Sequence, residues 1–258
     1  MLLAFDIGNT NIVVGCFEGK MLRETIRLKT VRDRTIDEYA AIIFPLLERK
    51  LGSLSNVSRA IISSVVPPVV GDIEKLLRKE LGIVPTIVGP GIRTGLAIRA
   101  KEPAAVGADR VVNAVAAKQL YPLPCVVIDF GTATSFDVIN SKGEYEGGII
   151  APGIHISLDA LVSRTAKLPR IQIEWPEAAL GRDTESAMRS GVVLGYKCMV
   201  DGLVDNLERE VGALASVVAT GGSGRLFAEQ SLRIRDYEPN LTLLGLRFLD
   251  ELNCAAEG

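Results

Sequence analysis

The same pattern of residues occurs twice in the chain, about half its length apart. In LLAFDIGNTNIVVG (residues 2–15) and CVVIDFGTATSFDVI (residues 125–139), an apolar strand ends in an aspartate, a turn with glycine and threonine follows, and a second apolar strand begins. The two aspartates, Asp6 and Asp129, are 123 positions apart in a chain of 258 residues. Self-similarity on this scale predicts a duplicated domain.

Apolar runs and helix signals alternate along both halves, which predicts an α/β protein with two lobes, residues 1–117 and 118–258. The expected strands are residues 1–7, 11–17, 21–28, 59–66, 83–88, two within 125–139, 144–150 and 215–220. The expected helices are a segment starting at Thr35, then residues 67–81, 104–120, 154–165, 184–211 and 241–252.

Capping signals fix two of these helices. Thr35 and Glu38 have the spacing of a capping box, so the first helix should begin there. Pro45, ten residues later, is expected to kink that helix or to move its start to a later residue. Gly82 should end the helix at 67–81.

Composition excludes several classes of protein. The chain has 29 Lys and Arg against 31 Asp and Glu, a formal net charge of −2, whereas nucleic-acid binding needs a clustered basic face. No apolar run approaches the roughly 18 residues of a membrane span, and no basic residue precedes the first apolar stretch as in a signal peptide. We therefore expect no nucleic-acid partner, no membrane association and a cytoplasmic location.

Cysteine and histidine usage argues against a metal or disulfide framework. The four cysteines are far apart and form no CxxC pair, so they are expected to be reduced core or surface thiols: Cys16, Cys125, Cys198 and Cys254. The single histidine, His155, is expected to be a packed or surface residue rather than a catalyst.

The repeated turns have the chemistry of a phosphate site. Gly8 lets the backbone approach a ligand closely, and the residues after it offer neutral hydrogen-bond donors. Asp6 could hold Mg²⁺ through its water shell, since this ion binds proteins through one or two carboxylates. In the second copy, Thr132 and Thr134 supply hydroxyls beside Asp129. The alternative is a pair of ordinary hairpin turns, which favour the same residues.

Three further motifs have both a structural and a functional interpretation. The loop ATGGSGR (residues 219–225) is either a flexible turn or a surface for an adenine ring. Asp109 and Arg110 either stabilise a helix start or bind a hydroxy-acid acceptor, with Asp109 taking the hydroxyl proton. Thr184 is expected to be a helix N-cap, with Glu185 and Ser186 in the first turn, at a helix start that could bind a carboxylate.

Taken together, these segments resemble the type III pantothenate kinases, in the superfamily of actin, sugar kinases and heat-shock chaperone ATPases. The resemblance covers essentially the whole chain and rests on DIGNTN at 6–11, VGADR at 106–110, DFGTATSFD at 129–137, GGIIAPGI at 147–154 and the Thr184 helix start. It implies two ribonuclease H-like lobes, each a mixed sheet flanked by helices, with a cleft between them. It also implies ATP-dependent phosphorylation of pantothenate to 4′-phosphopantothenate, the first step of coenzyme A biosynthesis.

The resemblance assigns roles to individual residues. ATP with Mg²⁺ would be held by Asp6, Ile7, Gly8, Asn9, Thr10, Asn11, Ile12, Val13 and Thr132. Pantothenate would be held by Gly107, Ala108, Asp109, Arg110 and Thr184, with Asp109 as the proton acceptor. Asp129 would bind the monovalent cation, K⁺ or NH₄⁺, and the protein would form a homodimer.

Two positions depart from the family pattern. Family members usually carry a tyrosine a few residues before GADR, where this chain has Ala100, and a threonine where it has Ser135. Two other functions stay open: a kinase of another acceptor such as a sugar or acetate, or an exopolyphosphatase, on the same fold, and a non-catalytic nucleotide-sensing regulatory module.

Overall fold

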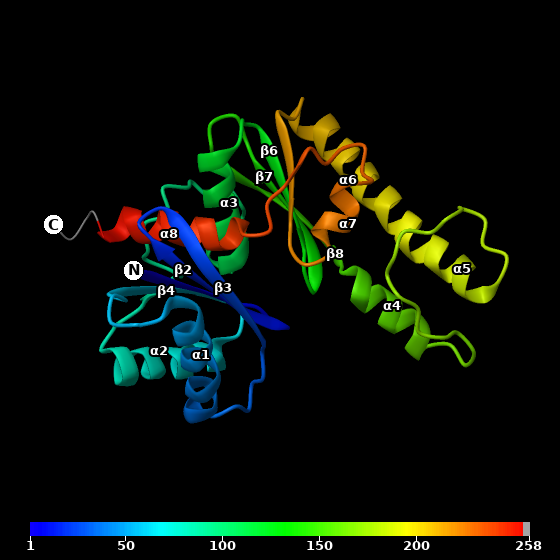
Figure 1. The fold of residues 1–258 in the computed structure, drawn as a ribbon. Coiled ribbons are helices and arrows are strands. Elements are labelled where there is room, and N and C mark those ends of the chain that lie inside the picture. The colour runs from blue at the N-terminus through cyan, green and yellow to red at the C-terminus, as the bar shows by residue number, and fades with distance from the viewer. Residues whose placement is uncertain (255–258) are drawn as a thin grey trace. The chain divides into compact units, whose positions relative to one another are not determined.

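The computed structural model describes residues 1–254, which form two compact units (Figure 1). The first unit contains Met1–Gly95, Glu102–Ala116 and Leu241–Cys254. The second contains Leu96–Lys101 and Ala117–Asn240. Each unit is built on a five-stranded mixed sheet with helices against it, so the predicted α/β class is confirmed.

The sheet of the first unit has the strand order β3-β2-β1-β4-β5. Its strands are β1 (Leu2–Ile7), β2 (Asn11–Glu18), β3 (Met21–Lys29), β4 (Arg59–Ser64) and β5 (Thr86–Ile87). β1 pairs antiparallel with β2 and parallel with β4. One face packs on α1 (Ile36–Leu51) and α2 (Pro67–Leu81), and the other contacts α8 (Leu241–Cys254).

The sheet of the second unit has the order β10-β9-β6-β7-β8. Its strands are β6 (Cys125–Phe130), β7 (Ala133–Ile139), β8 (Tyr145–Pro152), β9 (Ser216–Thr220) and β10 (Asp236–Tyr237). Its core side chains pack against α6 (Gly195–Val211) and α7 (Gly224–Ala228). Each strand corresponds to the strand five numbers earlier, with the same neighbours and directions. This identical order confirms the duplication.

Local sequence explains where the first helix begins. The Thr35 hydroxyl accepts a hydrogen bond from the Glu38 N–H, and the Glu38 carboxylate accepts one from the Thr35 N–H at 2.7 Å. The helix therefore starts at Ile36 and continues through Pro45, so the expected later start is wrong. Burial of one apolar face stabilises it across the proline, through Tyr39, Ile43 and Leu47.

Three predicted elements differ from the structure. The strand expected at 83–88 is reduced to β5. The helix expected from residue 104 begins as a 3₁₀ turn at Pro103–Ala105, and α3 proper is Ala108–Leu120. The helix expected at 184–211 is interrupted, because a π-helical turn at Ser190–Leu194 separates α5 (Thr184–Arg189) from α6.

The last helix belongs to the packing of the first unit. A methyl group placed at Gly15 would lie 2.9 Å from the Leu243 side chain, and one placed at Gly245 would lie 2.2 Å from the Val112 carbonyl oxygen. One boundary between the units falls inside α3, between Ala116 and Ala117, and the others follow Gly95, Lys101 and Asn240. The lobe limits 1–117 and 118–258 stay a prediction. In the structure, α8 packs against β1 and β2 of the first unit.

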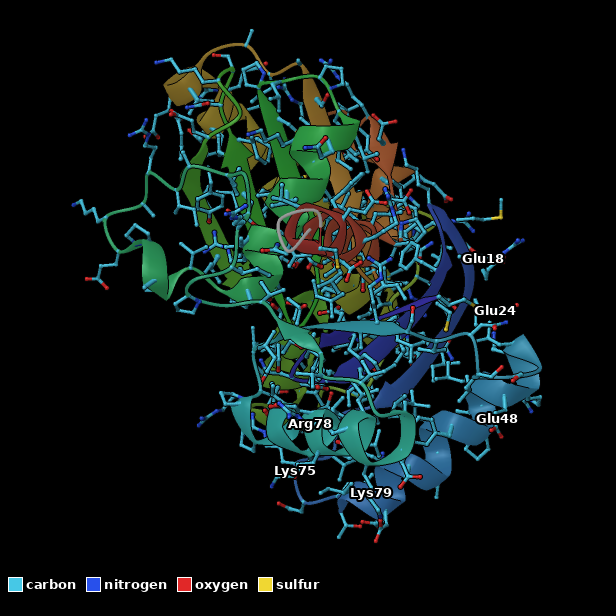
Figure 2. The ribbon with its side chains drawn as sticks, turned by 90° about the vertical axis from the view of Figure 1, so that its left-hand side faces the viewer. Glu18, Glu24, Glu48, Lys75, Arg78 and Lys79 are labelled. Carbon is cyan, nitrogen blue, oxygen red and sulfur yellow. The ribbon has the colours of Figure 1, made fainter. Side chains whose placement is uncertain are left out.

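Charges of both signs cover the outer helices of the first unit (Figure 2). Arg78 pairs with Glu74 one turn earlier in α2, at 2.9 Å, and Lys79 reaches Asp37 of α1 at 3.3 Å. Such exposed pairs contribute little stability each. Among residues 1–254 no helix has the length and apolar character needed to cross a bilayer.

Candidate functional site

The first turn, between β1 and β2, is hydrogen-bonded to Thr30, the residue that follows β3. The Thr30 hydroxyl donates to the Gly8 carbonyl at 2.7 Å, and the Thr30 N–H donates to the Thr10 carbonyl at 2.9 Å. The Gly8 N–H donates to the Asn11 carbonyl at 2.9 Å. Gly8 thus uses its own N–H inside the turn, and what it offers a ligand is the absence of a side chain. Asn9 and Thr10 are exposed at the tip.

Asp6 lies half-buried at the end of the central strand. In the sheet it is in register with Val13 of β2 and with Ser63 of β4. The flanking side chains of Phe5 and Ile7 belong to the core under α1 and α2. Because side chains alternate along a strand, Asp6 points to the other face, the one that α8 contacts.

The Asp-Arg pair stands at the start of α3. The Arg110 N–H donates to Asp109 Oδ1 at 2.8 Å, and Asp109 is the acidic residue in the first turn of the helix, where the structural interpretation places it. A methyl group at Gly107 would lie 2.5 Å from the same oxygen, so a larger residue there would require the Asp109 carboxylate to move. The first unit therefore contains the predicted residues 6–13 and 107–110.

The second turn repeats the first at the end of β6. Asp129 is in register with Ser135 of β7 and Thr220 of β9, and the Gly131 N–H donates to the Ala133 carbonyl at 3.1 Å. Gly131 and Thr132 are exposed.

Two glycines bring other loops of the second unit against this turn. A methyl group at Gly221, whose φ is +85°, would lie 2.5 Å from Asp129 Oδ1. One at Gly153 would lie 2.3 Å from the Thr132 carbonyl oxygen. The GGSGR loop and the start of α4 (Ile154–Ser163) therefore belong to the surroundings of Asp129. Nothing in the sequence indicated that these loops lie beside Asp129, apart from a glycine directly after a strand in each.

Two hydroxyls near the second turn have structural partners. Thr134 is buried and its hydroxyl pairs with the Tyr196 hydroxyl, so the expectation that Thr134 faces a ligand is wrong. Its position in phase with Phe136 accounts for this, because both side chains point into the core. Burial raises the pKa of Tyr196. The Ser135 hydroxyl donates to the buried Asp137 at 3.3 Å.

The N-cap of α5 is Asp183, so the assignment of that role to Thr184 is wrong. The Ser186 N–H donates to Asp183 Oδ1 at 2.9 Å, and Thr184 is the exposed first residue of the helix. Asp183 and Ser186 have capping-box spacing, whereas Thr184 would face Ala187, whose methyl group cannot bond back. The Ser186 bond lowers the pKa of Asp183.

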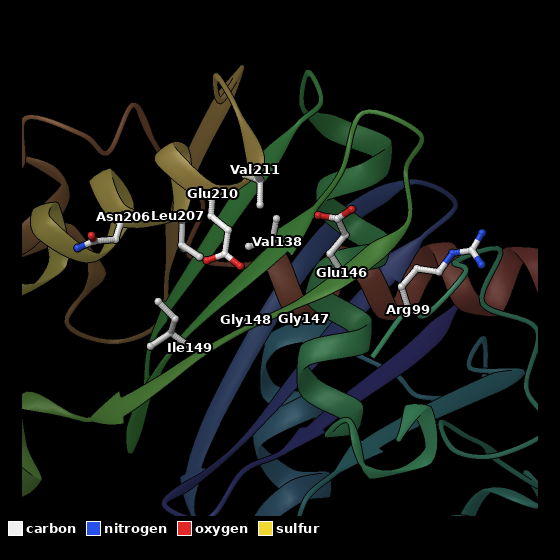
Figure 3. A pocket seen from close by; sticks show the side chains of 10 residues that line it. All are labelled: Arg99, Val138, Glu146, Gly147, Gly148, Ile149, Asn206, Leu207, Glu210 and Val211. Atoms are coloured by element: carbon white, nitrogen blue, oxygen red, sulfur yellow. The ribbon is translucent and has the colours of Figure 1, made fainter. Parts of the chain in front are cut away.

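The two buried cysteines are poor nucleophiles, whereas the single histidine lies among the segments that surround the second turn. Burial raises the pKa of the Cys16 and Cys125 thiols to about 12. His155, on the first turn of α4, is exposed and approaches the Ser223 hydroxyl at 3.5 Å. A pocket of about 410 Å³ opens between β8 and α6, with Glu146 and Glu210 in its lining, but none of the predicted site residues line it (Figure 3).

Each of the two turns could hold a cation through a single carboxylate. Within residues 1–254 no group of three or more His, Cys, Asp or Glu side chains is arranged to hold a metal ion. A cation at Asp6 or Asp129 would therefore take its other ligands from water, backbone oxygens and a bound phosphate chain. Magnesium, which retains several waters, suits a single carboxylate beside a hydroxyl residue such as Ser63.

Comparison with known proteins identifies the fold. The chain is similar to a candidate Baf family transcriptional activator from Campylobacter jejuni (18% identity, TM-score 0.60, covering 98% of this chain and 99% of that one). It is also similar to the activator of 2-hydroxyisocaproyl-CoA dehydratase from Clostridium difficile with bound ADPNP (11%, TM-score 0.57, covering 99% and 97%). A third similar structure is ethanolamine utilization protein EutJ from Carboxydothermus hydrogenoformans (18%, TM-score 0.55, covering 96% and 89%). The fold is that of actin-like ATPases and sugar kinases.

A family model narrows this fold to one group of enzymes. The model for type III pantothenate kinase matches residues 2–206, which include both turns, the start of α3 and the start of α5. Fold and family together support an ATP-using kinase. The chain belongs to the type III pantothenate kinase family.

Proposed function

We propose that this protein transfers the γ-phosphoryl group of ATP to the terminal hydroxyl of pantothenate, giving 4′-phosphopantothenate and ADP for coenzyme A biosynthesis. The observation that carries the proposal is the family match over residues 2–206. Every residue with a role in the proposed reaction lies inside that range, apart from the Gly221 loop beside Asp129. Phosphoryl transfer needs mainly alignment and neutralised charge, which two glycine turns with carboxylates can supply.

In this proposal the turn at residues 6–13 holds the phosphates of ATP, and Thr132 also takes part in ATP binding. The side chains of Ile7 and Ile12 are fully buried, so these two residues contribute through their backbone alone. Asn9 and Thr10, exposed at the tip, offer side-chain donors.

The acceptor is bound by Gly107, Ala108, Asp109, Arg110 and Thr184. Arg110 binds the pantothenate carboxylate, and Asp109 orients the terminal hydroxyl. As the hydroxyl oxygen bonds to the γ-phosphorus, the bond from that phosphorus to the β-γ bridging oxygen breaks, and the hydroxyl proton passes to Asp109. ADP leaves with the bridging oxygen. Asp109 needs little basicity, since the proton can leave late in a loose transition state.

Two cations complete the proposal. Magnesium, when bound, neutralises phosphate charge, and Asp6 holds its water shell. Asp129 binds K⁺ or NH₄⁺, with the Gly221 backbone against its carboxylate. Loss of potassium activation in Asp129→Ala supports this placement, and an unchanged potassium response rejects it. We also propose a cytoplasmic homodimer; sedimentation at a monomer mass in micromolar protein would reject the dimer.

The test is an acceptor panel. Protein, ATP, Mg²⁺ and K⁺ are incubated with equimolar pantothenate, glucose and acetate, and the products are identified by mass spectrometry. The proposal expects a phosphorylated product from pantothenate alone. A phosphorylated sugar or acetyl phosphate without phosphopantothenate would reassign the acceptor. ATP binding with no phosphorylated product would favour a regulatory module.

A further inference from the structure

Ser63 carries a buried hydroxyl that has no hydrogen-bond partner among residues 1–254. The residue is fully buried in β4, and its Oγ bonds to no other group in the part of the chain that the structure describes. Ser64, the next residue, is different: its hydroxyl donates to the Ile7 carbonyl at 3.3 Å and accepts from the Val66 N–H at 2.9 Å. Of these two adjacent serines on one strand, only Ser64 has hydrogen-bond partners for its hydroxyl among the described residues.

The position of Ser63 is defined by the sheet. It is in register with Asp6 on the neighbouring parallel strand, and strands in a sheet lie about 4.8 Å apart. In-register side chains of adjacent strands point to the same face. Since Ile62 belongs to the core under α1 and α2, Ser63 and Asp6 both point to the opposite face.

The second copy of the turn repeats this arrangement. Asp129 is in register with Thr220 on β9, the strand that corresponds to β4. Thr220 is likewise buried, with 2% of its surface exposed. Both turns therefore place a buried hydroxyl residue beside the aspartate, on the strand parallel to it.

A buried hydroxyl without a partner is costly, because it has lost its bonds to water and gained none. Native proteins leave few such groups, and each one requires a physical reason. An alanine at this position would carry no such penalty. A hydroxyl that serves the protein only in a ligand-bound state accounts for the serine.

We propose that Ser63 is a positioning residue for Asp6: in the complex with a magnesium nucleotide, its hydroxyl donates to the Asp6 carboxylate and fixes the oxygen that faces the ion's water shell. Ser63 can redirect its hydroxyl by rotation about χ1 between staggered positions. The inference rests on the proposed role of Asp6 at the nucleotide, and it does not depend on which acceptor is phosphorylated.

The experiment measures nucleotide binding rather than turnover. Calorimetric titration with a non-hydrolysable ATP analogue, in Mg²⁺ and in EDTA, gives the factor by which magnesium increases affinity. Ser63→Ala should reduce that factor by about tenfold, as expected for one hydrogen bond to a charged group. It should leave the affinity in EDTA unchanged and should not lower the thermal midpoint of the unliganded protein. Ser63→Thr, which retains the hydroxyl, should restore most of the magnesium effect.

Ser64→Ala is the matched control. It removes a hydroxyl that has partners, so it should lower the thermal midpoint and leave the magnesium effect unchanged. The inference is overturned if Ser63→Ala keeps the full magnesium effect, or if it lowers the midpoint and both affinities alike, as a structural hydroxyl would. Wild-type protein that binds no nucleotide overturns the inference and the proposed function together. If Ser63→Ala reduces the magnesium effect as expected but the wild-type protein forms no phosphopantothenate, only the choice of acceptor is overturned.

Discussion

Asp109 occupies a position where one carboxylate has two physically distinct uses. At the first turn of α3 a negative charge favours the helix by its interaction with the helix dipole, and Oδ1 accepts the Arg110 N–H at 2.8 Å. The same side chain is the proton acceptor in the proposed reaction. A substitution that keeps the hydrogen bond but removes the charge therefore tests proton acceptance, at the cost to the helix of the dipole interaction alone.

Asp109→Asn is that substitution. The amide oxygen can still accept from the Arg110 N–H, so we expect a circular dichroism spectrum like the wild type and a thermal midpoint within a few degrees. The turnover number should fall at least about 100-fold, the usual contribution of a positioned acid or base. A steady-state assay measures this, and a rate near that of the wild type would mean that another group takes the proton.

Single residues also mark what the sequence could and could not predict about the site. The carboxylates at the strand ends were predictable, because an apolar run that stops at aspartate and glycine is typical of a strand ending at a turn. The close approach of Gly221 to Asp129 was not, since it joins segments about 90 positions apart and depends on strand order. Thr134 was predictable in principle, because it is in phase with Phe136.

At the scale of elements, α5 depends on its cap. This helix is short, and its start is fixed by Asp183 rather than Thr184. Asp183→Ala should destabilise the start of the helix locally, because it removes the side-chain acceptor of the Ser186 N–H. Hydrogen exchange at the Ser186 amide, which donates to Asp183, reports this as faster exchange. Thr184→Ala is the control and should leave the exchange rate unchanged; equal effects of both substitutions would contradict the assignment.

An ion pair with a defined pH dependence joins the hairpin between β7 and β8 to Arg99, which lies in Leu96–Lys101 of the second unit. Arg99 donates to Glu144 Oε1 at 2.5 Å, and this bond, with a second from Asn140, lowers the pKa of Glu144 to about 2 from an ordinary 4.5. A carboxyl with a lowered pKa contributes stability that is complete above about pH 4.5 and is lost as the pH falls toward 2.

Arg99→Gln should therefore reduce this acid sensitivity. Between pH 4.5 and 2, the free energy of unfolding should fall less steeply in the variant than in the wild type, as measured by urea titrations at each pH. Arg170→Gln, which removes another exposed arginine of the second unit, is the control and should keep the wild-type slope near pH 3. If the free energy of unfolding falls equally steeply in Arg99→Gln and the wild type, the bond from Arg99 is not what lowers the pKa of Glu144.

Long periodic segments were predicted well, and interruptions were not. The helix at 67–81 and the Thr35 capping box follow from side-chain spacing and turn chemistry alone. The π-helical turn at Ser190–Leu194 contains Gly191 and precedes Gly195, and glycine weakens a helix without specifying a π-helical turn. Its Ser190 hydroxyl donates to the Ala179 carbonyl at 2.5 Å, a tertiary contact that sequence periodicity does not contain.

At the scale of the whole molecule, the packing of α8 determines which of the two units this helix stabilises. Leu243 is buried against Gly15 of β2, although the helix follows the second unit in sequence. The chain's lone tryptophan, Trp175, packs against the core of the second unit. Its fluorescence therefore reports that unit, whereas circular dichroism reports both.

Leu243→Ala should thus act on one unit. Deleting this side chain from a core costs about 2–5 kcal/mol. In urea, part of the circular dichroism transition should move to lower denaturant while the Trp175 transition keeps its midpoint. Val204→Ala, in α6 of the second core, is the reverse control and should move the fluorescence transition. A shift of the Trp175 midpoint in Leu243→Ala would contradict the assignment of α8 to the first unit.

The most direct test of the account is ADP release by purified protein with Mg-ATP, with and without pantothenate, in potassium and in sodium buffer. If the duplicated turns bind ATP and the Asp-Arg pair binds the acceptor, ADP forms at a substantial rate only when pantothenate and potassium are both present. ADP release that is unaffected by pantothenate, or no release under any of the four conditions, would contradict it.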